Sequence, residues 1–378
     1  MTRFALLGAE IFDGERRLGG HAVVIADDRI EALVPGDRLA PDTERVVLAG
    51  GLLVPGFIDI QVNGGGGVLF NDEPTVEGIA AIGRAHRAFG TTGFLPTLIS
   101  DDLDVIDRGM RAVEAAVQQG VPGVLGIHIE GPFINVEKRG IHDPGKIRKI
   151  DEAAVELLGS LKSGVTLITL APELDPPGMI EQLRQRGVTV AAGHTAASYE
   201  DTRDALQSGV TGFTHLFNAM TQLSSRAPGA VGAALESDQA WCGIIADGFH
   251  VHPAALRVAL RAKGPDKLVL VTDAMPTVGS DQTTFTLGGR TIHVENGRIA
   301  AEDGMLAGSN LNMAAAVGNA VRMLQVDLPA AVRMASLNPA RALGLEGTTG
   351  AIRPGLRADL ALLDSEGRTV RTWIAGAE

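Results

Sequence analysis

Eight apolar runs rich in β-branched residues recur along the chain, and longer segments separate most of them. The runs are LLVPGFIDIQV, TGFLPTLIS, VLGIHIEGPF, VTLITLAPE, VTVAAGHT, GFTHLFNAM, CGIIADGFH and KLVLVTDAM. Short apolar runs of this kind predict strands that are buried on both faces. Such strands are typical of a parallel sheet with helices on its faces.

The segments between these runs show the hydrophobic period of helices. They cover residues 75–89, 103–119, 152–162, 178–187, 198–208 and 253–263, and residues 312–324 and 329–343 follow the eighth run. Between the sixth and seventh runs the helical signal is poor, and SSRAPGAVGAAL is interpreted as a loop. Eight strand and helix units are enough to close a (β/α)8 TIM barrel of the α/β class. We predict this barrel over residues 55–344.

The two ends of the chain show a different pattern. Residues 1–54 contain short alternating runs with turn signals, such as HAVVIADDRIEALVPGD, and residues 345–378 contain ADLALLD and GRTVRTWIAG. Alternation predicts antiparallel strands with one buried face. We therefore expect a small β-sandwich domain built from both termini, with the barrel inserted between them. Residues 283–302 also predict hairpins, which either decorate the barrel or extend the small sheet.

Composition and charge narrow the function. Hydrophobic residues make up 45% of the 378 residues, charged residues make up 21%, and the formal net charge is −12. An acidic surface argues against nucleic acid and anionic membranes as partners, because both attract basic surfaces. The single cysteine excludes an intrachain disulfide and suits a reducing compartment, and no apolar run has the length of a membrane span. We therefore expect a cytoplasmic protein.

Ionisable residues lie near the ends of the predicted barrel strands, where a barrel presents its catalytic groups. Glu130, His194 and His215 belong to the third, fifth and sixth runs. One carboxylate and two imidazoles suit zinc, divalent iron or another first-row ion. The alternative is that both histidines are satisfied core residues and that Glu130 is an ion-pair partner. We predict one divalent metal ion per subunit, with zinc as the first choice.

Asp273 lies near the end of the eighth run. It is either an outer residue that orients a metal ligand, or the base that removes a proton from water and returns it to a leaving nitrogen. We favour the base.

Further short motifs occur in order through nearly the whole chain. They are VPGFID, HIEGPF, LAPE, GHT, HLFNAM followed by RAPG, DGFHV, LVTDAM, LAGSNLNM and IRPGLRADLALLD. Together they resemble the N-acetylglucosamine-6-phosphate deacetylase family of the amidohydrolase superfamily. The resemblance implies metal-dependent hydrolysis of N-acetyl-D-glucosamine 6-phosphate to D-glucosamine 6-phosphate and acetate, in amino-sugar catabolism.

The resemblance also implies roles for residues outside the ligand set. His142 in GIHDP is implied to polarise the acetyl carbonyl, while Arg226 and His250 are implied to bind the sugar phosphate. The family's dimers suggest that Arg226 acts across the interface of a homodimer. The remaining candidates for substrate contacts are Asn218 and Ala219 in FNAM, and Met305 and Leu306 near LAGS.

Gln61 and Asn63 depart from a pattern of the superfamily. Many amidohydrolases carry a His-x-His pair at this place that holds a second metal, and some members of this family use a single metal. Neutral amides are weak donors to a cation, so we expect no second metal site. The two side chains either have an outer role near the ion or simply fill the barrel and bind water.

Two other functions stay open from the sequence. The first is an N-acetylgalactosamine-6-phosphate deacetylase or another amidohydrolase on the same barrel, since the sequence does not decide the stereochemistry at C4 of the sugar. The second is a non-catalytic sugar-phosphate sensor. Asp273 argues against the sensor, which has no need of a base.

Overall fold

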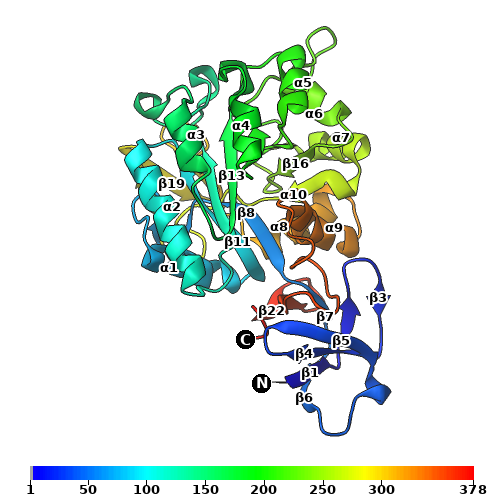
Figure 1. Cartoon of the computed structure of the whole chain (residues 1–378). Helices are drawn as coiled ribbons and strands as arrows, with labels where there is room; N and C mark the ends of the chain where they lie inside the picture. Colours follow the sequence, from blue (N-terminus) through cyan, green and yellow to red (C-terminus); the bar gives the residue numbers. More distant parts are fainter. Residues whose placement is uncertain (1–2) are drawn as a thin grey trace.

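Eight parallel strands form the barrel in this computed structural model, which describes residues 3–378 (Figure 1). They are β8 (Phe57–Val62), β11 (Thr91–Ile99), β12 (Gly126–Glu130), β13 (Val165–Leu170), β14 (Thr189–Ala192), β15 (Gly212–Phe213), β16 (Trp241–Ile244) and β17 (Leu268–Leu270). Each strand pairs with the next in chain order, and Val62 pairs in parallel with Ala274 to close the ring. The predicted TIM barrel is confirmed, and each of the eight apolar runs overlaps one of its eight strands.

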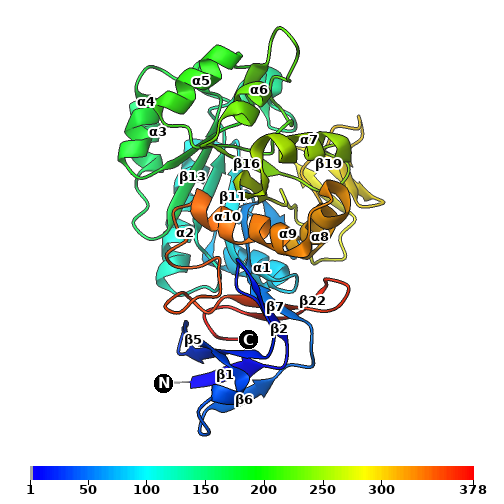
Figure 2. The same ribbon diagram turned by 90° about the vertical axis from the view of Figure 1, so that its right-hand side faces the viewer.

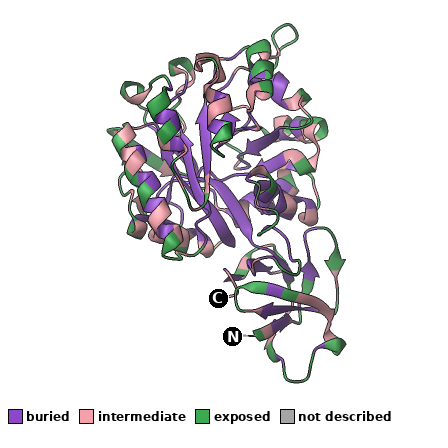
Figure 3. Ribbon diagram, viewed as in Figure 1, coloured by how far each residue is buried: buried purple, intermediate pink, exposed green. Residues whose placement is uncertain are grey.

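Helices surround the barrel (Figures 1 and 2). They are α1 (Val76–Arg87), α2 (Leu103–Gln118), α3 (Glu152–Leu158), α4 (Met179–Gln185), α5 (Tyr199–Ser208), α6 (Gly229–Glu236), α7 (Pro253–Lys263), α8 (Met313–Asn319), α9 (Leu328–Ala335) and α10 (Leu337–Ala342). Exposed residues lie on their outer faces, while the strands inside are buried (Figure 3). Among the described residues, no helix is long and apolar enough to cross a membrane.

Helix α6 lies inside the segment that was expected to be a loop. The chain runs without regular structure up to Pro228, and the helix begins at Gly229. Residues 229–234 of this helix are all buried. A helix that is buried around most of its circumference has no polar face and therefore no amphipathic period. The loop interpretation is wrong over these residues for that reason.

Two sheets pack together as a small domain that contains both ends of the described chain (Figure 1). One has the order β5-β4-β1-β6 and the other has the order β22-β21-β7-β2-β3. Their bounds are β1 (Arg3–Leu7), β2 (Glu10–Phe12), β3 (Arg17–Leu18), β4 (His21–Ala26), β5 (Arg29–Pro35), β6 (Glu44–Val47), β7 (Leu52–Pro55), β21 (Leu360–Leu363) and β22 (Thr369–Trp373).

A common core fills the space between these sheets and includes Leu6, Ile25, Leu53 and Trp373. Because β21 and β22 come from the far end of the chain, the small domain joins both termini, as expected. The pairing differs from the expectation in one respect, since β1 pairs with β6 and β2 pairs with β7 in parallel. The first two residues of the expected domain lie outside the described residues, and its limits at residues 54 and 345 stay predictions.

The predicted hairpins near residue 290 decorate the barrel. Strands β18 (Thr284–Leu287), β19 (Arg290–Glu295) and β20 (Arg298–Ala301) form a separate antiparallel sheet. Their apolar side chains pack in one cluster with Ile99 and Met275, which belong to the barrel. A second small sheet, β9 (Gly64–Gly65) and β10 (Val68–Leu69), follows β8 directly. Both additions lie near the carboxyl ends of barrel strands.

Candidate metal centre and active site

Left-handed backbone places three candidate side chains at the carboxyl ends of the strands. His194 follows β14, His215 follows β15 and Asp273 follows β17, with φ angles of 49°, 32° and 54°. This conformation is uncommon for residues other than glycine and costs about 1–3 kcal/mol per residue. Such strain persists only where neighbouring groups hold it, and it clusters at functional sites. The backbone therefore indicates a site at this end of the barrel.

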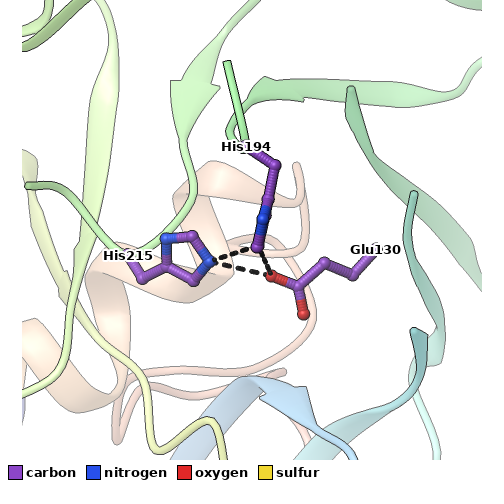
Figure 4. Close-up of side chains that lie close together, drawn as sticks. All are labelled: Glu130, His194 and His215. Atoms are coloured by element: carbon purple, nitrogen blue, oxygen red, sulfur yellow. Dashed lines mark hydrogen bonds and ion pairs between the residues drawn. The ribbon is translucent and has the colours of Figure 1, made fainter. Parts of the chain in front are cut away.

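Glu130, His194 and His215 converge on one point (Figure 4). Oε1 of Glu130 lies 3.2 Å from Nε2 of His194 and 2.9 Å from Nε2 of His215, and the two Nε2 atoms are 3.0 Å apart. All three side chains are buried. The barrel thus brings together one carboxylate oxygen and two imidazole nitrogens that are distant along the chain.

The protonation of His194 shows what this contact needs. Its Nδ1 lies 2.8 Å from the carbonyl oxygen of Lys138, which can only accept, so Nδ1 carries the proton. Nε2 of the neutral ring is then a lone pair, and it faces the Glu130 carboxylate and the second imidazole. Electron-pair donors this close repel one another unless a cation lies between them. A first-row divalent ion fits this set of donors.

The two carboxyl groups of the site have pKa values displaced in opposite directions. Burial alone would raise the pKa of Glu130, but hydrogen bonds and positive charge from the imidazoles of His194 and His215, in their protonated forms, outweigh burial and hold that pKa well below its ordinary value. Burial, together with the charge of Glu130, raises the pKa of Asp273. Environments that separate the pKa values of two carboxyl groups in this way suit the two groups to different chemical tasks.

Gln61 and Asn63 each hold one of these carboxylates. Nε2 of Gln61 donates to both oxygens of Glu130 at 3.1 Å, and Nδ2 of Asn63 donates to Oδ1 of Asp273 at 2.6 Å. Both amides are buried. An amide NH₂ group has no lone pair to offer a cation. The contacts therefore favour the outer role over simple filling of the barrel.

His142 faces the same point from the loop that follows β12. Its ring centroid lies 4.5 Å from that of His194. The backbone N–H of Ser100 donates to Nδ1 at 3.3 Å, so the proton of the neutral ring lies on Nε2. Burial, with His194 nearby, lowers the pKa of His142 to about 3. At neutral pH the ring is therefore an uncharged donor.

A cavity of about 280 Å³ joins these groups, close to the lower end of the range for small-molecule sites. Of the residues predicted from the sequence, it is lined by Glu130, His142, His194, His215, Asn218, Ala219, His250, Asp273, Met305 and Leu306. Gln61 and Asn63 do not line the cavity themselves, but each donates a hydrogen bond to a carboxylate that does. Arg226 is not part of the lining, because it is exposed on the loop before α6.

Several supporting residues were not singled out from the sequence. Ser100, the last residue of the second apolar run, fixes the tautomer of His142. The hydroxyl of Thr272 donates to Oδ2 of Asp59 at 2.5 Å, and the backbone N–H groups of Thr272 and Gln61 donate to Oδ1. Burial raises the pKa of Asp59 to about 7. Asp59 is a polar residue inside a buried strand, and Ser100 is a polar residue at the end of one. This position is the sequence feature that could have identified both.

Two family models match the chain. The model of the amidohydrolase family matches residues 52–377, and the model of the NagA composite domain matches residues 3–53. The chain belongs to the amidohydrolase family. The first match contains the whole barrel of this amidohydrolase, and the second contains strands β1 to β6 of its small domain and ends within β7. The resemblance inferred from the sequence motifs is confirmed.

Curated relatives are similar over most of their length. An N-acetylgalactosamine-6-phosphate deacetylase from Shewanella sp. (strain ANA-3) is 46% identical over 329 residues, which are 87% of this chain and 83% of that protein. An N-acetylglucosamine-6-phosphate deacetylase from Haemophilus influenzae is 34% identical over 377 residues, which are 99% of this chain and 98% of that protein. The relatives therefore include deacetylases of both epimers.

Solved structures show the same architecture. The crystal structure of N-acetylglucosamine-6-phosphate deacetylase from Pasteurella multocida has a TM-score of 0.95 at 34% identity and covers 99% of this chain and 98% of that chain. A mutant of the deacetylase from Mycobacterium smegmatis in complex with N-acetyl-D-glucosamine 6-phosphate has a TM-score of 0.91 at 32% identity, with 100% and 99% coverage. The agreement extends over the barrel and the small domain together.

Proposed function

We propose that this amidohydrolase removes the acetyl group of N-acetyl-D-glucosamine 6-phosphate and releases D-glucosamine 6-phosphate and acetate. The observation that carries the proposal is the convergence of Glu130, His194 and His215 with Asp273 and His142 on one cavity. Hydrolysis of an amide needs an activated water molecule, a proton acceptor and a donor to the carbonyl oxygen. Relatives and similar solved structures that carry this substrate in their names support the choice of substrate.

In this proposal Glu130, His194 and His215 hold one divalent cation per subunit. We propose zinc, with divalent iron or another first-row ion as the alternative, because carboxylate and imidazole ligands suit these ions. When bound, such an ion lowers the pKa of water toward about 7 and polarises a carbonyl oxygen. Gln61 turns its NH₂ group toward Glu130 and Asn63 turns its own toward Asp273, which supports an outer role for both amides in this proposal.

Asp273 acts first as the general base and then as the general acid. Its carboxylate accepts a proton from the water molecule that attacks the acetyl carbon, and it donates this proton to the amine nitrogen as the C–N bond breaks. Asn63 occupies Oδ1 of Asp273, which leaves Oδ2 for the proton. The raised pKa of the buried Asp273 helps it to hold the proton between the two steps.

His142 stabilises the negative charge that develops on the carbonyl oxygen. Its proton lies on Nε2 because Ser100 donates to Nδ1, so a neutral ring offers an N–H to this oxygen. A single donor of this kind contributes on the order of 3 kcal/mol to transition-state stabilisation. The pKa of about 3 keeps the ring in this state over the whole neutral range.

The rest of the cavity binds the sugar phosphate. Nδ1 of His250 lies 2.6 Å from Oδ2 of Asp247, which holds the ring and leaves Nε2 for the phosphate. The other contacts in this proposal come from Asn218 and Ala219, and from Met305 and Leu306, which line the pocket of the acetyl methyl group.

Arg226 is proposed to complete the phosphate site of a neighbouring subunit in a homodimer. Its side chain is exposed and lies outside the cavity of its own subunit. A guanidinium group matches the geometry of a phosphate, and a protein with a formal net charge of −12 needs a local cation to attract an anion. We propose a cytoplasmic location for this dimer, where the single cysteine stays reduced.

Replacing Arg226 with alanine is expected to raise KM for the phosphorylated sugar by roughly 10-fold to 100-fold and to leave the metal content unchanged. The lost interaction is a set of charge-assisted hydrogen bonds, worth about 1.5–3 kcal/mol. Steady-state kinetics of acetate release and metal analysis of the same preparation measure both quantities.

Arg108→Ala is the matched control for this prediction, since Arg108 is exposed on α2 and its side chain makes no hydrogen bond or ion pair within residues 3–378. Its KM should equal that of the parent protein. Equal hydrolysis of unphosphorylated N-acetylglucosamine by the parent protein would contradict the assignment of a phosphate site.

N-acetyl-D-galactosamine 6-phosphate is a second candidate substrate. The relative that favours it is the Shewanella deacetylase, which is 46% identical to this chain. The two sugars differ only in the configuration at C4, which lies away from the amide. The proposed chemistry is therefore the same for both epimers.

Acetate release from the two epimeric N-acetylhexosamine 6-phosphates tests the proposal in the presence of zinc. We expect a higher kcat/KM for the gluco epimer. A higher kcat/KM for the galacto epimer would transfer the assignment to the second candidate. Release from neither sugar, with metal bound, would favour the non-catalytic sensor.

A further inference from the structure

Glu173 fixes the chain that leaves His194. It lies in the short 3-10 helix η4 (Pro172–Leu174), directly after β13. Its Oε1 accepts the backbone N–H of Ala196 at 2.6 Å, and its Oε2 accepts the hydroxyl of Thr195 at 2.5 Å. The Thr195 oxygen accepts the backbone N–H of Ala197 at 3.0 Å, so its own proton is directed to Glu173. One carboxylate therefore holds the two residues that follow the candidate ligand.

The same carboxylate holds the loop on the other side of His194. Nδ2 of Asn135 donates to Oε1 of Glu173 at 2.9 Å, and the backbone N–H of Asn135 donates to the carbonyl oxygen of His194 at 2.9 Å. Oδ1 of Asn135 caps the 3-10 helix η2 (Val136–Lys138) by accepting the backbone N–H of Glu137 at 2.9 Å. The carbonyl oxygen of Lys138 in turn accepts Nδ1–H of His194.

These contacts form a closed circuit around one imidazole. Glu173 binds the backbone that follows His194 on one side. On the other side it binds Asn135, whose loop carries the Lys138 carbonyl oxygen that accepts from the His194 ring. His194 has a φ angle of 49°, which its neighbours must hold in place. Its lone pair points at Glu130 and His215 only while Nδ1 donates to Lys138.

We propose that Glu173 is a positioning residue that sets the orientation and tautomer of His194 for metal binding. The inference rests on the proposed metal centre and adds a residue that touches neither the ion nor the substrate. All three groups that Glu173 binds are donors, and a carboxylate is an acceptor at both oxygens. Glutamine would keep one accepting oxygen and turn an NH₂ group toward a donor, while alanine would remove every contact.

The affinity for zinc is the quantity that this role controls. Glu173→Ala is expected to weaken zinc binding by roughly 10-fold to 100-fold, as is typical when an outer partner of a metal ligand is lost. Glu173→Gln should recover most of this loss, because it keeps one acceptor. At saturating zinc, kcat of both variants should lie near that of the parent protein, and KM should not change. A purely structural role would not produce this pattern.

Competition with a chelator measures the zinc Kd of the full-length protein and its variants. The matched control is Glu156→Ala, because Glu156 is exposed on α3 and its side chain makes no hydrogen bond or ion pair among the described residues. Thr195→Val is a second variant of similar shape. It removes only the hydroxyl contact and should weaken zinc binding in the same direction by a smaller factor.

A weaker zinc Kd in Glu173→Ala, recovery in Glu173→Gln and no change in Glu156→Ala would support the proposal. A zinc Kd in Glu173→Ala equal to that of the parent protein would overturn it. If Glu173→Ala does not fold, an unchanged Kd in Thr195→Val would overturn it instead. If the proposed metal centre itself were wrong, the parent protein would bind zinc no better than Glu130→Gln. This outcome is distinguishable from a failure of the Glu173 proposal alone.

Discussion

Replacing Asp273 with asparagine is expected to lower kcat by at least about a hundredfold while the protein keeps its fold and its metal. Asparagine has nearly the same shape but cannot accept the proton of the attacking water molecule or return it to the amine. The side chain stands beside the ligand set and is not part of it, so zinc binding should persist. Steady-state acetate release and metal analysis of the purified variant measure the two outcomes.

The matched control is Asp266→Asn, the same change at the opposite end of the same strand. Asp266 lies just before β17, is exposed, and forms an ion pair with Arg333 at 3.6 Å. Its kcat should equal that of the parent protein. Near-normal turnover of Asp273→Asn would remove this residue from the proton transfers.

Replacing Glu130 with glutamine is expected to remove both the metal and the activity. In the parent protein the NH₂ group of Gln61 donates to both Glu130 oxygens. The change removes the charged ligand and places a second amide against this NH₂ group. Zinc affinity should fall by more than the roughly 10-fold to 100-fold typical for an outer partner, since a direct ligand is lost. Elemental analysis after dialysis against a metal-free buffer gives the number of ions per subunit.

Glu137→Gln provides the control for this second change. Glu137 is exposed on η2, and its side chain makes no contact with the ligand set. One ion per subunit is expected in this control and in the parent protein. A full complement of metal in Glu130→Gln would show that this carboxylate is not a ligand.

The barrel is predictable from the sequence because a strand buried on both faces leaves a direct pattern of apolar residues. Each of the eight runs overlaps a barrel strand, including the short β15. Helix α6 escapes prediction because its buried surface shows no period, and the place of the hairpins near residue 290 depends on contacts with Ile99 and Met275 that no local pattern encodes. Tertiary packing decides both cases.

The candidate ligand set is predictable for a related reason. Parallel strands end at one rim, so Glu130, His194 and His215 meet there although they are distant along the chain. Their supports are harder to foresee. A backbone carbonyl such as that of Lys138 has no signature in the sequence. Glu173 lies in the short 3-10 helix η4, and the fold alone determines which residues it contacts. Arg226 is proposed to bind the phosphate in the neighbouring subunit of a homodimer.

The proposed metal centre can be examined in an anomalous-difference map of a crystal grown with zinc, recorded above and below the zinc absorption edge. We expect one zinc peak per subunit, bound by a carboxylate oxygen of Glu130 and by Nε2 of His194 and His215, at zinc to nitrogen distances of about 2.0–2.1 Å. A peak held by other side chains, or no peak at these three residues, would contradict the proposed metal centre.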